Sequence, residues 1–101
     1  MFVPLFALPL TIHLIITVAD GVPKLDVAAS CRAAAAATQT KDRLQTCLDS
    51  EQRSHDKLVK EWLDYTPVDR VNCSKAIIQF EPTYTELLTC LEMARDVKKL
   101  K

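Results

Sequence analysis

The chain is poor in the residue that nucleotide-binding loops depend on. Its 101 residues contain one glycine, Gly21, which lies at the end of an apolar N-terminal segment. Phosphate-cradling loops and dinucleotide-binding turns need several glycines, so the sequence after Gly21 excludes sites of these types. Tight two-residue hairpins also favour glycine, which argues against an all-β fold.

The sequence also lacks an excess of charge of either sign. Thirteen Lys and Arg residues balance thirteen Asp and Glu residues. A protein that binds DNA or RNA through its phosphates needs a clear basic excess on one face. We therefore expect no nucleic-acid partner.

Charge is missing altogether from the first 19 residues. This stretch is mostly apolar and ends in the small residue Ala19, with Gly21 shortly after it, which is typical of a signal peptide and its cleavage site. The sequence thus predicts a signal-type leader, residues 1–21, and one domain, residues 22–101. The alternative is an uncleaved membrane anchor, because about 20 apolar residues can cross a bilayer. Pro4, Pro9 and His13 weaken that alternative, and we expect a periplasmic or secreted protein that contacts a membrane only if the leader is uncleaved.

The domain has the pattern of four helices. Asp26 is placed to cap a helix from Val27 through the alanine run, and Thr38-Gln39-Thr40 indicates a turn. A long helix is predicted from Lys41 to Asp64. Thr66 then caps a third helix, Glu81-Pro82 ends it, and the capping box Thr83-Tyr84-Thr85-Glu86 begins a fourth. The spacing of apolar residues predicts the inward faces of the last two helices: Cys73, Ala76, Ile77 and Phe80, then Leu87, Cys90, Leu91, Ala94 and Val97.

The spacing of the four cysteines predicts how they pair. Cys31 and Cys47 lie eight residues on either side of Gln39, and Cys73 and Cys90 lie about eight on either side of the Glu81-Pro82 break. Eight residues span about 12 Å along each arm of a helical hairpin, so each pair lies at one level. We predict Cys31–Cys47 and Cys73–Cys90, although four cysteines allow three connectivities. The expected fold is all-α: two antiparallel hairpins, each closed by a disulfide.

Other uses of the cysteines have weaker support. No two are spaced as C-x-x-C, which argues against a redox dithiol or attached haem. Zinc ligands usually come in close pairs, and such pairs are missing. We expect no metal and no other cofactor.

Glu51 and His55 interrupt the apolar stripe of the second helix. They lie one turn apart on the same face, so we expect a hydrogen-bonded polar seam that reaches a residue of the last helix such as Arg95. The competing hypothesis is that they bind a metal or act as acid and base. Two ligands are too few for a tight metal site, and the domain has no second histidine. Trp62 and Tyr65, which continue the same stripe, are expected to complete the core.

The C-terminal run PTYTELLTCLEM, residues 82–93, resembles a signature of small exported four-cysteine helical proteins from rhizobia-like alphaproteobacteria. The layout of the cysteines, Trp62, Tyr65 and Arg70 is similar too, so the resemblance covers about residues 25–100. It implies an exported bacterial helical domain and implies no activity. A weaker likeness, carried by Trp62, Arg70 and Cys73, is to helical four-cysteine periplasmic lysozyme inhibitors.

Three hypotheses for function follow. The favoured one is a non-enzymatic interaction module with a protein partner in the cell envelope. The alternative is a lysozyme-inhibitor-like protein, and a second alternative is a small metal- or thiol-dependent enzyme. The first two need an exposed binding surface, whereas the third needs a concave site at Glu51 and His55 or a free thiol.

Overall fold

The computed structural model describes residues 21–38 and 41–100, and within them the chain forms four α-helices, a short 3₁₀-helix and no strand. Of the predicted turn Thr38-Gln39-Thr40, Thr38 belongs instead to the preceding helix, whereas Gln39 and Thr40 lie outside the described residues. The predicted leader up to residue 20, with His13, lies outside them too. The all-helical fold predicted from the sequence is confirmed. Its elements are α2 (Val27–Thr38), α3 (Lys41–Glu61), the 3₁₀-helix η1 (Trp62–Asp64), α4 (Pro67–Gln79) and α5 (Tyr84–Lys99).

Three helices begin where the sequence places a cap. Side-chain oxygens of Asp26, Thr66 and Thr83 each accept a hydrogen bond from the backbone N–H three residues later, at 3.3, 3.2 and 3.1 Å. These bonds satisfy N–H groups that have no acceptor within the first turn of a helix. The long second helix ends slightly earlier than predicted, because its last turn tightens into η1.

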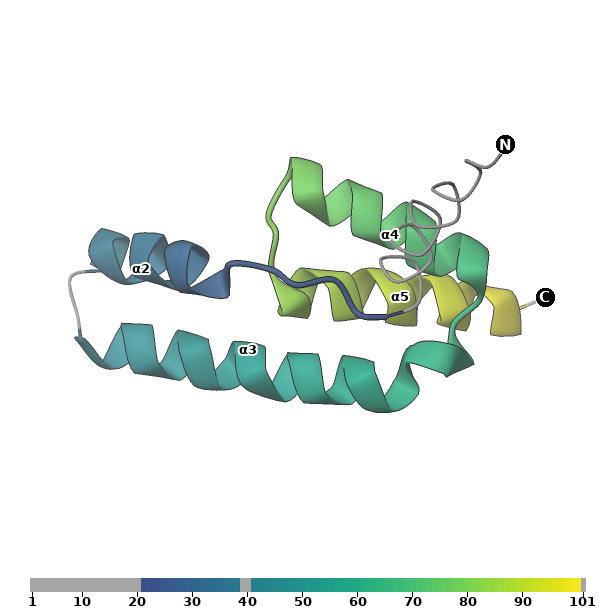
Figure 1. Cartoon of the computed structure of the whole chain (residues 1–101), viewed down its shortest axis with the longest axis horizontal. Helices are drawn as coiled ribbons and strands as arrows, with labels where there is room; N and C mark the ends of the chain where they lie inside the picture. The colour runs from purple at the N-terminus through teal and green to yellow at the C-terminus, as the bar shows by residue number, and fades with distance from the viewer. Residues whose placement is uncertain (1–20, 39–40, 101) are drawn as a thin grey trace, which may run out of the picture.

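The helices are arranged along α3, the longest of them. Figure 1 shows α2 beside the N-terminal part of α3, whereas α4 and α5 lie together toward its C-terminal part. The helix pairs that pack most extensively are α2 with α3, α3 with α5, and α4 with α5. The two predicted hairpins are therefore joined through the contact between α3 and α5.

Each hairpin is closed by the disulfide that the cysteine spacing predicts. Cys31–Cys47 links α2 to α3 with a Cα–Cα distance of 5.5 Å, and Cys73–Cys90 links α4 to α5 at 5.7 Å. Both distances fall in the ordinary range for disulfides. The predicted connectivity is confirmed.

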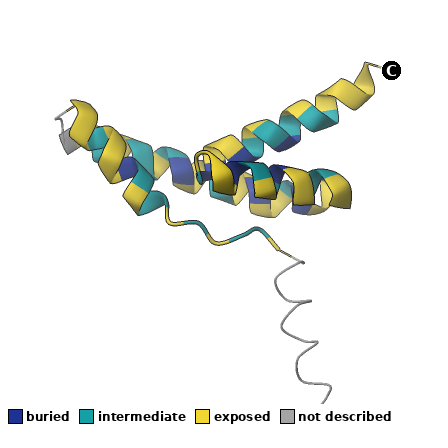
Figure 2. Ribbon diagram, turned by 90° about the horizontal axis from the view of Figure 1, so that it is seen from above, coloured by how far each residue is buried: buried dark blue, intermediate teal, exposed yellow. Residues whose placement is uncertain are grey.

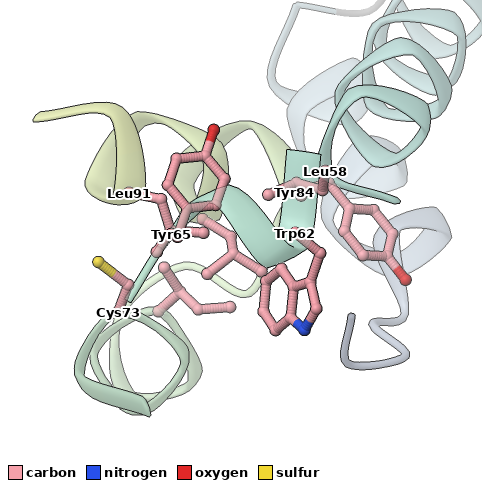
Figure 3. Close-up of a cluster of buried hydrophobic side chains, with 8 residues drawn as sticks. Leu58, Trp62, Tyr65, Cys73, Tyr84 and Leu91 are labelled. Carbon is pink, nitrogen blue, oxygen red and sulfur yellow. The ribbon is translucent and has the colours of Figure 1, made fainter. Parts of the chain in front are cut away.

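The main core lies where α3, η1, α4 and α5 meet (Figure 3). Leu58, Leu87 and Leu91 are completely buried, and Trp62 and Tyr65 are 6% and 3% exposed. The prediction that both aromatic residues complete the core is confirmed. The long helix α3 thus contributes its C-terminal half to this core and its N-terminal half to the contact with α2.

An extended segment, residues 21–26, precedes α2 and is tied to the core by Tyr84. The Tyr84 hydroxyl donates to the Pro23 carbonyl and accepts from the Leu25 N–H, both at 3.0 Å. Val22 and Leu25 pack against the core as partly buried residues. Residues immediately after the proposed leader are therefore an integral part of the folded domain.

Two residues predicted to face inward are exposed instead. Phe80 is 83% exposed and Val97 is 55% exposed. The reason is the arrangement of the described helices: α2 packs along α3 and does not cover the α4–α5 pair, so none of these helices lies against one side of that pair. Figure 2 shows buried residues concentrated where the helices meet, with exposed residues along their outer sides.

Candidate functional site

The predicted polar seam is a helix cap rather than an open site. Glu51 is 4% exposed, and its carboxylate points at the first turn of α5. It accepts hydrogen bonds from the N–H groups of Tyr84 and Thr85, at 2.6 and 3.3 Å, and from the Thr85 hydroxyl at 2.5 Å. The first N–H groups of a helix lack internal acceptors and lie at its positive end, so a buried carboxylate is stabilised there.

His55 lies beside this cap and takes no direct part in it. Its ring packs edge-on against the Tyr84 ring, with centroids 4.8 Å apart and an interplanar angle of 70°. Its Nδ1 atom lies 3.5 Å from Asp56, which is its neighbour in the chain. The prediction of a hydrogen bond between Glu51 and His55 is wrong, because the α5 N–H groups and the Thr85 hydroxyl take up the Glu51 carboxylate.

The predicted link from this seam to Arg95 is also wrong. Arg95 follows Tyr84 by eleven residues on α5, about 16 Å along the helix axis. Its guanidinium instead lies over the Tyr65 ring, 5.3 Å from the centroid, and contacts Glu61 at 3.7 Å. The seam prediction identified the correct helix and the wrong end of it.

The hypothesis of a metal- or thiol-dependent enzyme requires a cluster of metal ligands or a free thiol near Glu51 and His55. Within residues 21–38 and 41–100, no three His, Cys, Asp or Glu side chains lie together as a metal site. All four cysteines form disulfides, so none provides a thiol in this structure. The seam provides one imidazole beside a carboxylate that is already hydrogen-bonded through both oxygens.

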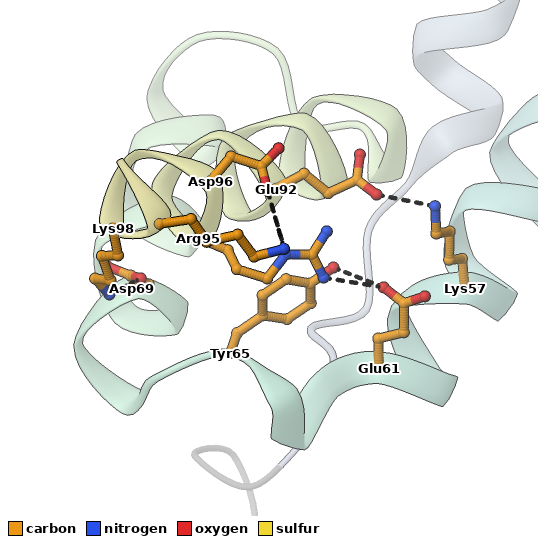
Figure 4. Close-up of polar contacts among 9 residues, drawn as sticks. Lys57, Glu61, Tyr65, Asp69, Glu92, Arg95, Asp96 and Lys98 are labelled. Atoms are coloured by element: carbon orange, nitrogen blue, oxygen red, sulfur yellow. Dashed lines mark hydrogen bonds and ion pairs between the residues drawn. The ribbon is translucent and has the colours of Figure 1, made fainter. Parts of the chain in front are cut away.

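A second polar group joins the two hairpins at the other end of the core (Figure 4). The Tyr65 hydroxyl donates to Glu61 at 3.0 Å, beneath the Arg95 guanidinium. Burial of the phenol, together with this bond to a carboxylate, raises the pKa of Tyr65 to about 12. Tyr65 therefore stays protonated through the physiological range. Nearby, Lys57 pairs with Glu92 at 2.9 Å, and Lys98 pairs with Asp69.

An apolar groove lies between α4 and α5. The apolar spacing of α4 does not predict this groove, because it places Phe80 in the core. The groove has a volume of about 320 Å³. Phe80 and Met93 stand at its sides, 83% and 63% exposed, while buried Ile77 and the half-buried Cys90 lie deeper. We call this feature the α4–α5 groove, and its apolar lining consists of Ala76, Ile77, Phe80, Cys90 and Met93.

The polar residues of the groove include two acidic ones, Glu81 and Glu86. The sequence predicted that the Glu86 carboxylate would close the capping box by accepting from the Thr83 N–H. That N–H donates instead to the Glu81 carbonyl, at 2.7 Å, so half of the box forms. In the described part of the chain, neither carboxylate has an ion-pair partner.

Comparison with known proteins gives no relative for this chain: no protein-family model, no curated protein and no solved structure matches it.

Proposed function

We propose that this chain is an exported, non-enzymatic binding protein that holds a protein partner of the cell envelope in the α4–α5 groove. The observation that carries the proposal is the exposure of Phe80 and Met93 on either side of one apolar hollow. Large apolar side chains gathered around a concavity mark interaction sites more often than isolated exposed residues do. Aromatic residues and methionine are also enriched in the buried centres of protein interfaces.

The apolar surface continues beyond the groove along α5. Met93, Val97 and Leu100 follow one another at spacings of four and three residues, and they are 63%, 55% and 84% exposed. Residues at these spacings share one face of a helix. The face presented to a partner is therefore longer than the hollow itself and extends to the C-terminal end of α5.

Two features support export. The first 19 residues carry no charge, as in the apolar part of a signal peptide. The two disulfides are consistent with an oxidising compartment, where such bonds persist. We place the folded domain in the periplasm or outside the cell.

Site-specific crosslinking in intact cells tests the binding function. Met93 is replaced by the photoreactive residue benzoylphenylalanine, and Lys60, an exposed residue of α3 outside the groove, receives the same replacement as a control. We expect a discrete crosslinked product with an envelope protein at position 93 and none at position 60. Equal products at both positions, or none at position 93, would contradict the proposal.

The export part of the proposal has its own measurement. N-terminal sequencing of the protein from the periplasmic or secreted fraction is expected to begin at Asp20 or Val22, the residues that follow Ala19 and Gly21. An intact Met1 on protein recovered from the cytosol would contradict it.

A further inference from the structure

The α4–α5 groove has the shape and charge to select one kind of partner. We infer that its occupant is an amphipathic helix with basic residues at one end of its apolar face. This inference rests on the proposed binding function and specifies the chemistry of the partner.

The walls of the groove favour a helix as the occupant. The two walls are antiparallel helices of 13 and 16 residues. At the rise of an α-helix the shorter wall is about 20 Å long, and this length limits how much of a helix the groove can hold. A third helix packs against two neighbours by placing its side chains between theirs, and helix-in-groove recognition uses apolar anchors at this periodicity. The hollow between Phe80 and Met93 is of a size to take such an anchor. Met93 adds an adaptable side chain suited to packing against a partner.

The position of α5 in the fold shows which side is open. Leu87 and Leu91 turn toward the core and are completely buried, whereas Met93 and Leu100 lie on the exposed side. With α3 packed on one side of α5 and α4 on another, an added helix would cover a third side. That helix would bury Phe80, which is the core residue the sequence predicted and the isolated chain leaves exposed.

The acidic residues at one end of the groove determine which charge a bound helix should carry there. Glu81 and Glu86 both lie at the end of the groove where α4 finishes and α5 begins, and no Lys or Arg is among the described residues that line it. The positive end of α5 at this place is already matched by Glu51, so it does not offset the two free carboxylates. A cation near this end gains complementary contacts, whereas an anion is repelled.

Two synthetic peptides test this selection. Both are 18-residue helices with capped termini and leucines at i, i+3, i+4 and i+7 spacing; one carries lysines at one end of the apolar face and the other carries glutamates there. Binding to the purified, oxidised protein is measured by fluorescence anisotropy of labelled peptide. We expect the lysine peptide to bind about fivefold more tightly at low ionic strength, as a few partly exposed charge pairs provide. The difference should shrink as salt is added.

Two variants assign any binding to the groove. Glu81→Lys with Glu86→Lys should reverse the preference between the peptides, and Phe80→Ser with Met93→Ser should abolish binding of both. All four residues are exposed, so the fold should survive, which circular dichroism and disulfide mapping can check. Equal binding of the two peptides, or lysine-peptide binding that survives Phe80→Ser with Met93→Ser, would overturn the inference.

Other occupants give distinct results. Self-association in sedimentation velocity that Phe80→Ser removes would identify a second copy of this chain and overturn the inference, as would groove-dependent binding to phosphatidylglycerol vesicles. If neither peptide binds but the crosslink at position 93 forms, the basic helix is wrong and the binding function stands. If the crosslink is also missing, the binding function fails with it.

Discussion

The two hairpins carry equivalent disulfides, but α2 of the first hairpin buries far fewer side chains than α4 and α5 of the second. Cys31–Cys47 and Cys73–Cys90 close segments of nearly equal length, with sequence separations of 16 and 17 residues. In α2 the one buried residue is Cys31 itself, whereas α4 and α5 supply Cys73, Ile77, Tyr84, Leu87 and Leu91 to the main core. Helix α2 lies along α3 and buries no side chain fully except that of its disulfide cysteine, whereas in the second hairpin the disulfide reinforces a core of buried side chains.

This difference shows how the stability of a small domain can be distributed between a packed core and covalent links. A domain of about 80 residues has a small core and depends on covalent links. Here the main core lies between α4, α5 and the C-terminal part of α3, whereas α2 lies beside the N-terminal part of α3 (Figure 1). Substitutions on the two sides should therefore have unequal effects, and the following predictions test this inequality.

The largest effect should come from removing a core side chain of the second hairpin. Leu91 is completely buried, so Leu91→Ala leaves a cavity and should lower the free energy of unfolding by about 3 kcal/mol or more. Leu44→Ala, at a half-buried position in the first turn of α3, should lower it by less than half as much. Urea denaturation of the two variants measures both values. Equal losses would mean that the hairpins are packed alike.

Removing each disulfide should destabilise a different part of the molecule, which distinguishes the two hairpins. Loop entropy predicts a loss of about 3 kcal/mol for each pair of Cys→Ala substitutions. Cys31→Ala with Cys47→Ala should also release α2 locally, because α2 has no other fully buried side chain. Amide hydrogen exchange in residues 27–38 should then become fast while α5 stays protected. Cys73→Ala with Cys90→Ala should weaken the whole core and leave Cys31–Cys47 oxidised; exchange that accelerates uniformly in both variants would contradict the comparison.

The Glu51 cap connects the hairpins, so removing it should have an intermediate effect. Glu51→Ala leaves the buried N–H of Tyr84 and the partly buried N–H of Thr85 without this acceptor, and should lower the free energy of unfolding by about 2 kcal/mol. Glu51→Gln keeps one acceptor oxygen and should cost less. Thermal unfolding of both variants gives the order. A smaller loss for Ala than for Gln would show that the carboxylate is not acting as a cap.

The smallest expected change in stability concerns Tyr65, which lies at the other end of the core from Glu51. Its pKa is about 12 in the folded chain, against about 10 for an ordinary tyrosine. Between these values the unfolded chain releases the phenol proton and the folded chain keeps it, so stability falls as pH rises from about 10 to 12. Tyr65→Phe should lack this component. Absorbance titration of the phenolate in both proteins measures the pKa, and a value near 10 would contradict the buried bond to Glu61.

Much of the architecture was predictable because its signals are local. Helix starts depend on caps such as Thr66 and Thr83, whose hydrogen bonds span three residues. The disulfide pairing followed from distances along two hairpin arms, which the helical rise determines. Burial of Trp62 and Tyr65 followed from apolar periodicity. Each of these inferences needs little knowledge of how the hairpins pack together.

The candidate site was less predictable for the opposite reason. Glu51 and His55 were correctly placed on one face, but the choice between a hydrogen bond to each other and a cap on α5 depends on which end of α5 faces them. Phe80 and Val97 have the spacing of core residues, and periodicity does not say whether a further helix covers them. The groove is open because none of the described helices covers Phe80 and the residues around it.

The sequence by itself determined the helices, their caps, the two disulfides and an uncharged N-terminal stretch. The tertiary structure alone decided that α2 packs beside α3 at a distance from α4, that Glu51 caps a helix 33 residues away, and that an apolar groove with an acidic end stays open. The physical reason is range: caps and helical periodicity act within a few residues, whereas the packing of one hairpin against another depends on the whole surface that each one presents.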